Sequence, residues 1–598
     1  MPHPTIRTSG FNHRPWPLFL SWLSLLWLAA APVSALEVKQ VIWGFDDHVV
    51  PGRFNLLSVL IANSSNDPFD GTVNFYKSRG MADRVGALYS APCYLSPLTT
   101  RWVQFYVFIQ NQYDQWRLEW GHGDNEHYDL DAPKWGPPAT VLLTDPDAPE
   151  AAGAIKQFPD DLFPPTVAAT SGLHSLVLDH APRWEQAKRQ AFLDWIRAGG
   201  KVHLLMGADG RYPSFPDDLA MLNTSADRLR IGAGLLVRHA ASAREFHESD
   251  MRDDEVPLQQ FKQGESPAMM AQSAGSILGI LARMSQRRYS WGGIYLLAIL
   301  YVAAAGPANL LAGRKISDYR LRIALFLAII GGFALLFNFV GRRGQGEANA
   351  VHSLSYARAI DGNTYDVTQW VTVFAARGAQ YTITHAAPHN LYATGLDYEA
   401  VNGLIENGRD GRFMVDIPMF SRRAFLHEAE MKGANIPLKI SSWDGGRTLE
   451  RLVITAGPDF PKEILEGWML LGDRIYPMKI ANGGLVFETS DSETIEEFVA
   501  SIPPEYGMSF GPNYGPIADQ ATNEDSQFRQ LAKPLVAWGL SLEDFTRLKG
   551  SSPAPADQVQ LFLFARSPAS FGIAGSSFGR ETGYVLYQFD LLKPAKTG

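Results

Sequence analysis

Asp179 and His180 are neighbours at the end of an apolar run, Ser175 to Leu178. The run has the length and composition of a buried strand, and α/β proteins bind ligands at the carboxyl ends of such strands. An acid and a base at this place could activate water for hydrolysis. The two side chains could equally cap the next helix and form a polar rim. The sequence favours the capping and rim role. A catalytic role for Asp179 and His180 is the alternative.

Three other stretches resemble chemical motifs, and each lacks a part. Gly575–Gly579 matches the G-x-S-x-G nucleophile elbow, but it lies between two strand-like runs instead of leading from a strand into a helix. The polar stretch His122–His127 resembles a metal site, but it falls in a predicted hairpin loop, where polar residues gather anyway. His427–Glu430 lacks the second histidine of the HExxH zinc motif. We therefore expect no metal and no cofactor.

The composition limits the class of protein. The chain has 598 residues, which is too long for one core and favours three or four domains. Its 53 basic and 62 acidic residues give a net charge of −9, which argues against a nucleic-acid binder because neutralising phosphates needs a basic face. Cys93 is the only cysteine in the sequence, so no intramolecular disulfide can form.

Residues 1–35 have the pattern of a signal peptide. Arg7 and Arg14 precede the apolar run Leu18 to Ala31, and a small-residue site ends at Ala35. We expect cleavage after Ala35, with an uncleaved membrane anchor as the alternative. Both interpretations put residue 36 outside the cytoplasm.

A segment at residues 286–345 contains two further apolar runs, at about 292–313 and 321–340. Each is long enough to span a membrane as a helix, and each is apolar all round, unlike a soluble helix. Pro307 interrupts the first run. By the positive-inside rule, the basic loop between the runs is cytoplasmic and both flanking domains are extracytoplasmic. The basic residues of this loop are Arg314, Lys315, Arg320 and Arg322.

Residues 36–134 predict a β-sandwich, because short alternating runs are separated by turn signals. Trp116, Leu118 and Trp120 share one strand face, which is most simply a core face. We expect strands at residues 54–61, 71–76, 102–109 and 115–120.

Residues 135–285 change to a β/α pattern. Apolar strands are expected at residues 140–144, 175–178 and 201–206, with a helix from about 183 to 198 before the last of them. Alternation of this kind predicts a parallel sheet covered by helices.

Residues 346–598 read as β-rich, with Ser490 and Glu493 as a capping box before a helix that contains Ile495 and Phe498. The whole chain is thus predicted to be a multidomain α+β membrane protein.

The stretches "LVLDHAP…FLDWIRAGGKVHLLMG" and "IYLLAILYVAAAGPANLLAGRK" carry a resemblance. The chain resembles bacterial membrane proteins with a β-sandwich, a flavodoxin-like class I glutamine amidotransferase-like domain, transmembrane helices and a further β-rich region. The amidotransferases attack with a cysteine on a sharp turn after a strand. The turns after Leu178 and Met206 contain neither cysteine nor serine, and Cys93 belongs to the predicted sandwich. The resemblance therefore implies a domain that has lost its catalytic residue.

The resemblance also implies a cellular location and partner proteins. Similar proteins are encoded near MoxR-type ATPases and von Willebrand factor A-type proteins, so membrane or envelope proteins are the expected partners, beside the lipid bilayer. The sequence then predicts an extracytoplasmic scaffold or binding protein of the bacterial cytoplasmic (inner) membrane, with both large domains on the periplasmic side and no enzymatic activity. The alternative is an extracytoplasmic hydrolase that uses Asp179 and His180.

Overall fold

The protein is strand-rich, as predicted, and the strands that the structure describes form six sheets. The computed structural model describes residues 36–593, so the predicted signal peptide lies outside the described residues. Within that range the structure does not describe residues 80–82, 112, 122–125, 148–154, 208, 252–267, 285–290, 345–348, 395–398, 446–448, 458–459, 462, 482–483, 489–491, 503–523, 544–557 and 576–577.

The N-terminal sandwich packs a three-stranded sheet, β1-β3-β6, against a larger seven-stranded sheet. The alternation in β7 points Trp116 and Trp120 inward, and the ring of Trp116 stacks on Phe75 of β4 with 4.8 Å between centroids. The predicted core face is therefore correct. These strands are β1 (Leu36–Trp43), β3 (Phe54–Asn63), β4 (Phe69–Arg79), β5 (Asp83–Leu95), β6 (Thr100–Phe108), β7 (Gln115–Trp120) and β8 (His127–Leu130). A short parallel pair, β2 (His48–Val49) and β9 (Lys134–Trp135), lies beside them.

The seven-stranded sheet draws on two distant parts of the sequence. Its order is β18-β22-β20-β5-β4-β7-β8, so three strands that follow the apolar helices complete the sheet of the N-terminal sandwich. The junction is parallel, with Ile405 of β20 opposite Tyr89 of β5. The three added strands are β18 (Ala379–Ile383), β20 (Ala400–Glu406) and β22 (Arg412–Ile417).

The α/β region has a six-stranded sheet in the order β11-β10-β12-β13-β15-β14, in which only β14 is antiparallel. This is the strand order of flavodoxin-like sheets with an added antiparallel edge. The predicted strands are present, and the predicted helix begins at Gln186, three residues later than expected. The elements are β10 (Ala139–Thr144), β11 (Gln157–Pro159), β12 (Leu173–Leu178), α2 (Gln186–Arg197), β13 (Lys201–Met206), β14 (Arg228–Ile231) and β15 (Gly234–Ser242). Three short 3-10 helices lie between the described elements of this region, and η4 (Glu248–Met251) follows β15. The three are η1 (Asp160–Leu162), η2 (Val167–Thr170) and η3 (Asp217–Leu222).

The C-terminal region is built on a ten-stranded sheet, β21-β19-β23-β17-β16-β32-β31-β26-β27-β30. Its strands are β16 (Ala350–Asp361), β17 (Thr364–Ala375), β19 (His389–Thr394), β21 (Gly408–Arg409), β23 (Ser421–Lys432), β26 (Ile464–Leu471), β27 (Arg474–Pro477), β30 (Glu493–Thr494), β31 (Gln558–Arg566) and β32 (Arg580–Leu592). A four-stranded sheet consists of β24 (Leu438–Gly445), β25 (Leu449–Ala456), β29 (Gly484–Glu488) and β28 (Lys479–Ala481).

The predicted capping box is one turn out of place. Thr494 and Glu497 form the box at the start of α7 (Ile495–Ala500), instead of Ser490 and Glu493. Glu493 lies in β30, where it pairs with Ile475 of β27, so it is not available to the helix.

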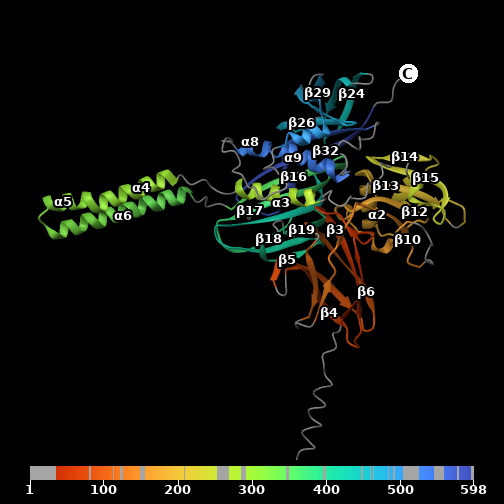
Figure 1. The fold of residues 1–598 in the computed structure, drawn as a ribbon, viewed down its shortest axis with the longest axis horizontal. Helices are drawn as coiled ribbons and strands as arrows, with labels where there is room; N and C mark the ends of the chain where they lie inside the picture. Colours follow the sequence, from red (N-terminus) through yellow and green to blue (C-terminus); the bar gives the residue numbers. More distant parts are fainter. Residues whose placement is uncertain are drawn as a thin grey trace, which may run out of the picture.

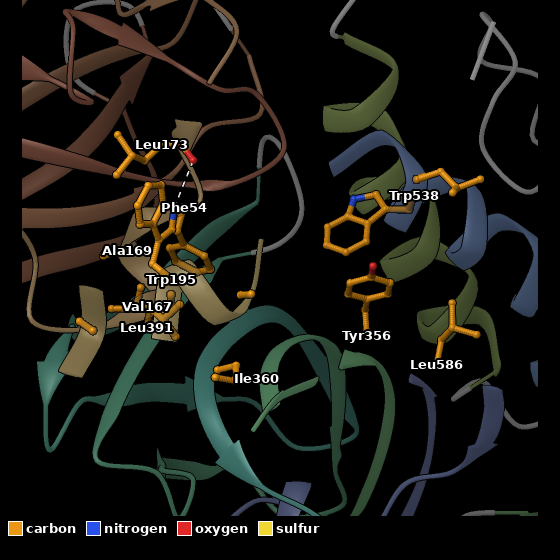
Figure 2. Packing of buried hydrophobic residues seen from close by; sticks show 14 of the residues in the cluster. Phe54, Val167, Ala169, Leu173, Trp195, Tyr356, Ile360, Leu391, Trp538 and Leu586 are labelled. Carbon is orange, nitrogen blue, oxygen red and sulfur yellow. Dashed lines mark hydrogen bonds between the residues drawn. The ribbon is translucent and has the colours of Figure 1, made fainter. Parts of the chain in front are cut away.

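One face of the ten-stranded sheet is covered by helices. α2, η2, α3 (Ala268–Met284) and α9 (Ala532–Glu543) pack on it, together with α7 and α8 (Glu524–Arg529). The short helix η8 (Ala569–Phe571) packs on the opposite face, where Phe571 lies against Tyr365. Figure 2 shows the cluster, in which Trp538 of α9 meets Tyr356 of β16 edge to face at 5.1 Å. Trp195 of α2 belongs to the same cluster and donates to the Leu173 carbonyl at 3.4 Å. The α/β region and the C-terminal sheet therefore share one core.

The two apolar runs form a helical hairpin that projects from the body (Figure 1). Both helices are long and apolar enough to cross a membrane, over Gly292–Lys315 and Tyr319–Phe339, and none of either span is buried. Pro307 interrupts the first helix as predicted, because the five residues around it form a π-helical turn. The helices are α4 (Trp291–Ala303), η5 (Ala304–Ala308), α5 (Asn309–Lys315) and α6 (Tyr319–Gly344).

Candidate functional site

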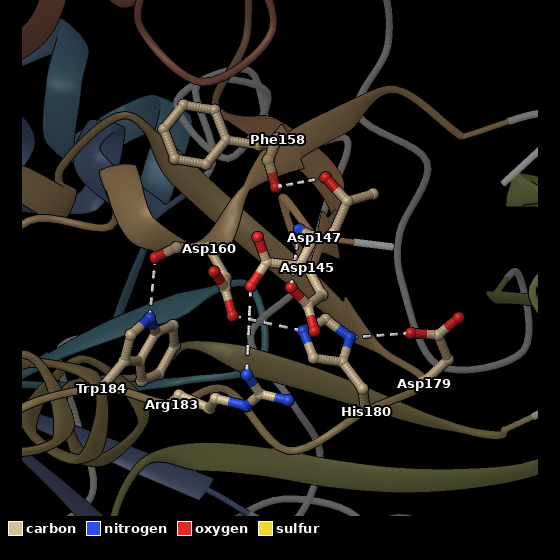
Figure 3. Close-up of polar contacts among 9 residues, drawn as sticks. Asp145, Asp147, Phe158, Asp160, Asp179, His180, Arg183 and Trp184 are labelled. Carbon is tan, nitrogen blue, oxygen red and sulfur yellow. Dashed lines mark hydrogen bonds and ion pairs between the residues drawn. The ribbon is translucent and has the colours of Figure 1, made fainter. Parts of the chain in front are cut away.

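Asp179 and His180 lie at the carboxyl edge of the parallel sheet, as the sequence predicts. Strands β10, β11 and β12 run in the same direction, so the residues that follow them meet at one edge. This arrangement adds Asp160, which follows β11, to the predicted pair (Figure 3). The candidate site is therefore three residues from two loops.

His180 is held between two carboxylates. Its Nδ1 lies 2.9 Å from Asp179 Oδ1, and its Nε2 lies 3.3 Å from Asp160 Oδ2. Asp160 is itself fixed, because the Trp184 indole donates to its backbone carbonyl at 2.7 Å and its residue surface is only 7% exposed. Both nitrogens of the imidazole therefore have a partner.

The charge of His180 follows from these contacts. Burial alone would lower its pKa, but the hydrogen bonds and charges of Asp160 and Asp179 outweigh burial and raise the pKa to about 9. The ring is then an imidazolium at neutral pH and cannot take a further proton. A general base must be neutral and have a free nitrogen, which His180 lacks in this state. We call Asp160, Asp179 and His180 the ion triad.

The turn where the amidotransferase resemblance places a nucleophile adjoins this triad. A Cβ at Gly207, directly after β13, would lie 3.3 Å from the Asp179 carbonyl oxygen. Gly207 N–H donates to the Arg211 carbonyl at 2.8 Å, which closes the turn. Glycine brings no side chain for attack. Cys93 lies in β5, where it is buried as predicted, and burial raises the pKa of its thiol, which makes it less reactive.

The other sequence motifs have different outcomes. Ser576 and Ser577 of the elbow motif and residues 122–125 of the metal-like stretch lie outside the described residues. Among the residues that the structure describes, no group of three or more potential ligands is placed to hold a metal ion. His427 to Glu430 form part of β23, whose alternation sends His427 to one face of the sheet and the two glutamates to the other.

Those glutamates belong to a polar junction that the sequence did not reveal. We call Asp194, Asp366, Glu428 and Glu430 the acidic junction, because they meet where α2 and η2 pack on β17 and β23. Asp194 Oδ2 accepts from Gln190 at 2.7 Å.

Arginines and a small cavity complete the junction. Arg197 donates to Asp194 Oδ1 at 2.9 Å, and Arg53 and Arg358 are the other nearby cations. Ser171 donates to Glu428 at 2.9 Å. A cavity of about 290 Å³ opens beside Glu430.

Burial raises the pKa values of three carboxyls in the junction. The pKa of Glu430 rises to about 7, through burial and then the neighbouring Asp194 and Asp366. The pKa of Asp366 rises to about 6 by burial, against the charge of Arg358, and that of Glu428 rises well above its ordinary value. A carboxyl with a pKa of about 7 is partly protonated at neutral pH, so Glu430 makes the contact between the α/β region and the C-terminal sheet sensitive to pH.

The comparisons with known proteins give no family. No protein-family model and no curated protein matches the chain. A solved Mu homology domain from Danio rerio with a bound peptide is 9% identical and covers 41% of this chain and 96% of its own, with a TM-score of 0.19. A cycloisomaltooligosaccharide glucanotransferase from Paenibacillus sp., complexed with cycloisomaltoheptaose, is 8% identical and covers 77% and 98%, with a TM-score of 0.15. At these scores neither likeness bears on fold or function.

Proposed function

We propose that the protein is a membrane-anchored extracytoplasmic scaffold of a bacterial envelope, with a catalytically degenerate amidotransferase-like domain. The observation that carries this proposal is the pairing of β20 with β5, because strands from before and after the hairpin build one sheet. The two soluble segments form one body with a shared core, and the hairpin ties this body to the bilayer. Such an arrangement suits a protein that holds partners in a fixed place.

The charge of the hairpin and the shared sheet support one side of the membrane for the body. Strands on opposite sides of a bilayer cannot pair, so the segments that flank the hairpin belong on the same side. The ends of α5 and α6 that flank their short connection carry Arg314, Lys315, Arg320 and Arg322, which favours the cytoplasmic side for this end of the hairpin. The body is then extracytoplasmic, in agreement with the signal peptide that the sequence predicts.

The ion triad supports binding over catalysis. His180 is charged and has both nitrogens engaged, so it is a poor base for the hydrolase alternative. The expected partners are membrane or envelope proteins, among them MoxR-type ATPases and von Willebrand factor A-type proteins.

The test is purification of the full chain from its native membranes at native expression level, followed by native mass spectrometry. We expect a complex in which this chain and a second protein have a fixed stoichiometry. The matched control is His180→Gln, which should retain the same partner in the same ratio, because a scaffold does not need a base.

Two results together would overturn the scaffold in favour of the hydrolase. The first is a full-length chain that runs as a bare monomer under these conditions. The second is turnover of ester or amide substrates by that monomer, lost in His180→Gln and in Asp179→Asn.

A further inference from the structure

The turn between β22 and β23 has an unusual residue at its tightest point. Ser421 closes the turn, with its N–H and its hydroxyl both donating to the Pro418 carbonyl, at 3.2 and 2.7 Å. Phe420 is the third of the four residues and has a φ of 54°. Turns with positive φ at this position normally use glycine or asparagine, because a Cβ is strained there. A phenylalanine at this position indicates a requirement other than folding.

The turn also exposes its apolar side chains. Met419 is 63% exposed and Phe420 is 46% exposed, so two large hydrophobic residues stand side by side in solvent. Arg377, on the neighbouring β17–β18 turn, is exposed as well. The two turns touch, because a Cβ at Gly378 would lie 2.9 Å from the Met419 nitrogen. Phenylalanine and other apolar side chains beside basic residues are typical of segments that insert into the boundary between headgroups and acyl chains.

The register of the ten-stranded sheet places this turn at the end nearest the hairpin. Ser421 lies opposite Ala375, and Ala350, which opens β16, lies opposite Phe374. Asn349 accepts from the Ala376 N–H at 2.9 Å.

Asn349 follows the end of α6 at Gly344 by five residues, which span at most about 18 Å. The turn that touches Met419 is therefore tied to the exit of the hairpin.

The entry to the hairpin reaches the same end of the sheet. Arg422, two residues after Phe420, donates to the Ala282 carbonyl in the last turn of α3 at 2.7 Å. Helix α3 ends at Met284, seven residues before α4 begins at Trp291. Figure 1 shows α3 and β17 on the side of the body from which the hairpin projects.

We propose that Met419 and Phe420 insert into the boundary between lipid headgroups and acyl chains of the membrane that the hairpin spans. The inference rests on the proposed membrane anchorage and adds a second contact, made by the body itself. The hydrogen bonds of Asn349 and Arg422 hold this apolar pair at the end of the body from which the hairpin leaves. With this contact the body has a fixed tilt on the membrane surface, which a hairpin alone would not impose.

The structure provides a matched control at the far end of the seven-stranded sheet. Leu98 is 71% exposed and has a φ of 57°, so it is another strained apolar turn residue. Strand β22 ends beside the Met419 turn. Strand β20 is antiparallel to β22, and β5 is parallel to β20, so both of these strands begin near that turn. β5 therefore begins at the hairpin end and runs to Leu95, which places Leu98 about 30 Å beyond Gly86.

The test measures contact with lipid at single positions. The full chain, with Cys93→Ser, receives one cysteine by Met419→Cys, Leu98→Cys or Leu335→Cys and is labelled with bimane. Leu335 is an exposed residue of α6 and reports on the hairpin itself. The labelled proteins are placed in nanodiscs of phosphatidylethanolamine and phosphatidylglycerol, with or without bromine on the upper acyl chain.

We expect bromine to quench bimane at positions 419 and 335 and to leave position 98 unchanged. Adding Phe420→Gly to Met419→Cys should reduce the quenching, because glycine retains the turn and removes the ring.

Each contrary result has a defined meaning. Quenching at 335 without quenching at 419 would overturn the turn contact and leave the anchorage intact, as expected if the pair binds a protein. Equal quenching at 419 and 98 would overturn it as well. Absence of quenching at 335 would overturn the anchorage and the turn contact together.

Discussion

Asp366 and Glu430 lie directly opposite each other on β17 and β23, on the face of the sheet that α2 covers. Two carboxyls in this position cannot both be charged without cost, and burial adds to the cost. Their presence makes the contact between the α/β region and the C-terminal sheet weaker than an apolar contact at neutral and alkaline pH.

Glu430→Gln should stabilise the protein at alkaline pH. The pKa of Glu430 is raised from 4.5 to about 7 in the folded protein, so its contribution to stability is full below pH 4.5 and is lost as the pH rises through 7. The variant should gain about 2 kcal/mol over wild type at pH 8 and nothing at pH 4, after allowance for partial exposure. Urea unfolding in detergent across this range measures the difference. Glu496→Gln, an exposed change on α7, is the control and should show no such trend.

His180→Gln should destabilise the protein at acidic and neutral pH and have no effect at alkaline pH. The pKa of His180 is raised from 6.5 to about 9, so the stability that the triad contributes is full below pH 6.5 and is lost as the pH rises through 9. We expect a loss of about 2 kcal/mol at pH 6 that disappears by pH 10. The same unfolding measurement applies, with His247→Gln, an exposed histidine, as the control. A loss that does not change with pH would contradict the charged triad.

Gly86→Ala should damage the junction between the two soluble segments. Gly86 has a φ of 73°, and a Cβ there would lie 2.4 Å from the Thr394 hydroxyl, beside the pairing of β5 with β20. Strain and overlap together should cost about 2–4 kcal/mol. Gly210→Ala has nearly the same φ, 72°, with nothing within 4 Å, so it should cost only the strain, about 1–2 kcal/mol. Similar losses in the two variants would show that the junction tolerates the added methyl group.

Reporter fusions should reveal the arrangement in the membrane. A cytoplasm-active reporter fused after Ser317, in the connection between α5 and α6, should be active, and one fused after Gly403 in β20 should be inactive. The basic residues at the helix ends beside this connection and the predicted signal peptide both predict this result. The reverse pattern would invert the body and contradict the extracytoplasmic location.

Phe420→Gly should stabilise the protein in detergent, although it removes a large apolar side chain. The φ of 54° strains phenylalanine and not glycine, so relief of strain should add about 1 kcal/mol to the free energy of unfolding. Met419→Gly, next to it in the same turn, has no positive φ to relieve and should not stabilise. A destabilised Phe420→Gly would show that the ring packs within the body.

The sequence revealed the strands that have a clear local pattern. β7 alternates and β10 is continuously apolar, so both are visible from residue order alone. It did not reveal β11, because three residues have no period, and Asp160 was missed together with the strand that places it. The capping box was placed one turn early because Ser490 and Glu493 have the same spacing as Thr494 and Glu497.

Sequence patterns could not predict which strands pair when they are far apart in the chain. Nothing in β5 indicates that its neighbour is β20, because alternation defines a strand and not its partner. The acidic junction could not be predicted for the same reason. Asp194, Asp366 and Glu430 come from three elements and meet only when α2 packs on the sheet. At Glu428 and Glu430 the sequence showed only an incomplete match to the HExxH zinc motif.

The order of synthesis gives the shared sheet a further consequence. β5 emerges early and can pair with β4, but its second neighbour, β20, begins only at residue 400, after both apolar helices. The ten-stranded sheet can be completed only later in synthesis, because β32 lies between β16 and β31 and ends at Leu592. An incomplete chain therefore leaves open strand edges, which are sites of aggregation in nascent proteins. A ribosome that stalls after the hairpin would leave a product anchored but unfinished, and a quality-control protease could recognise it by those edges.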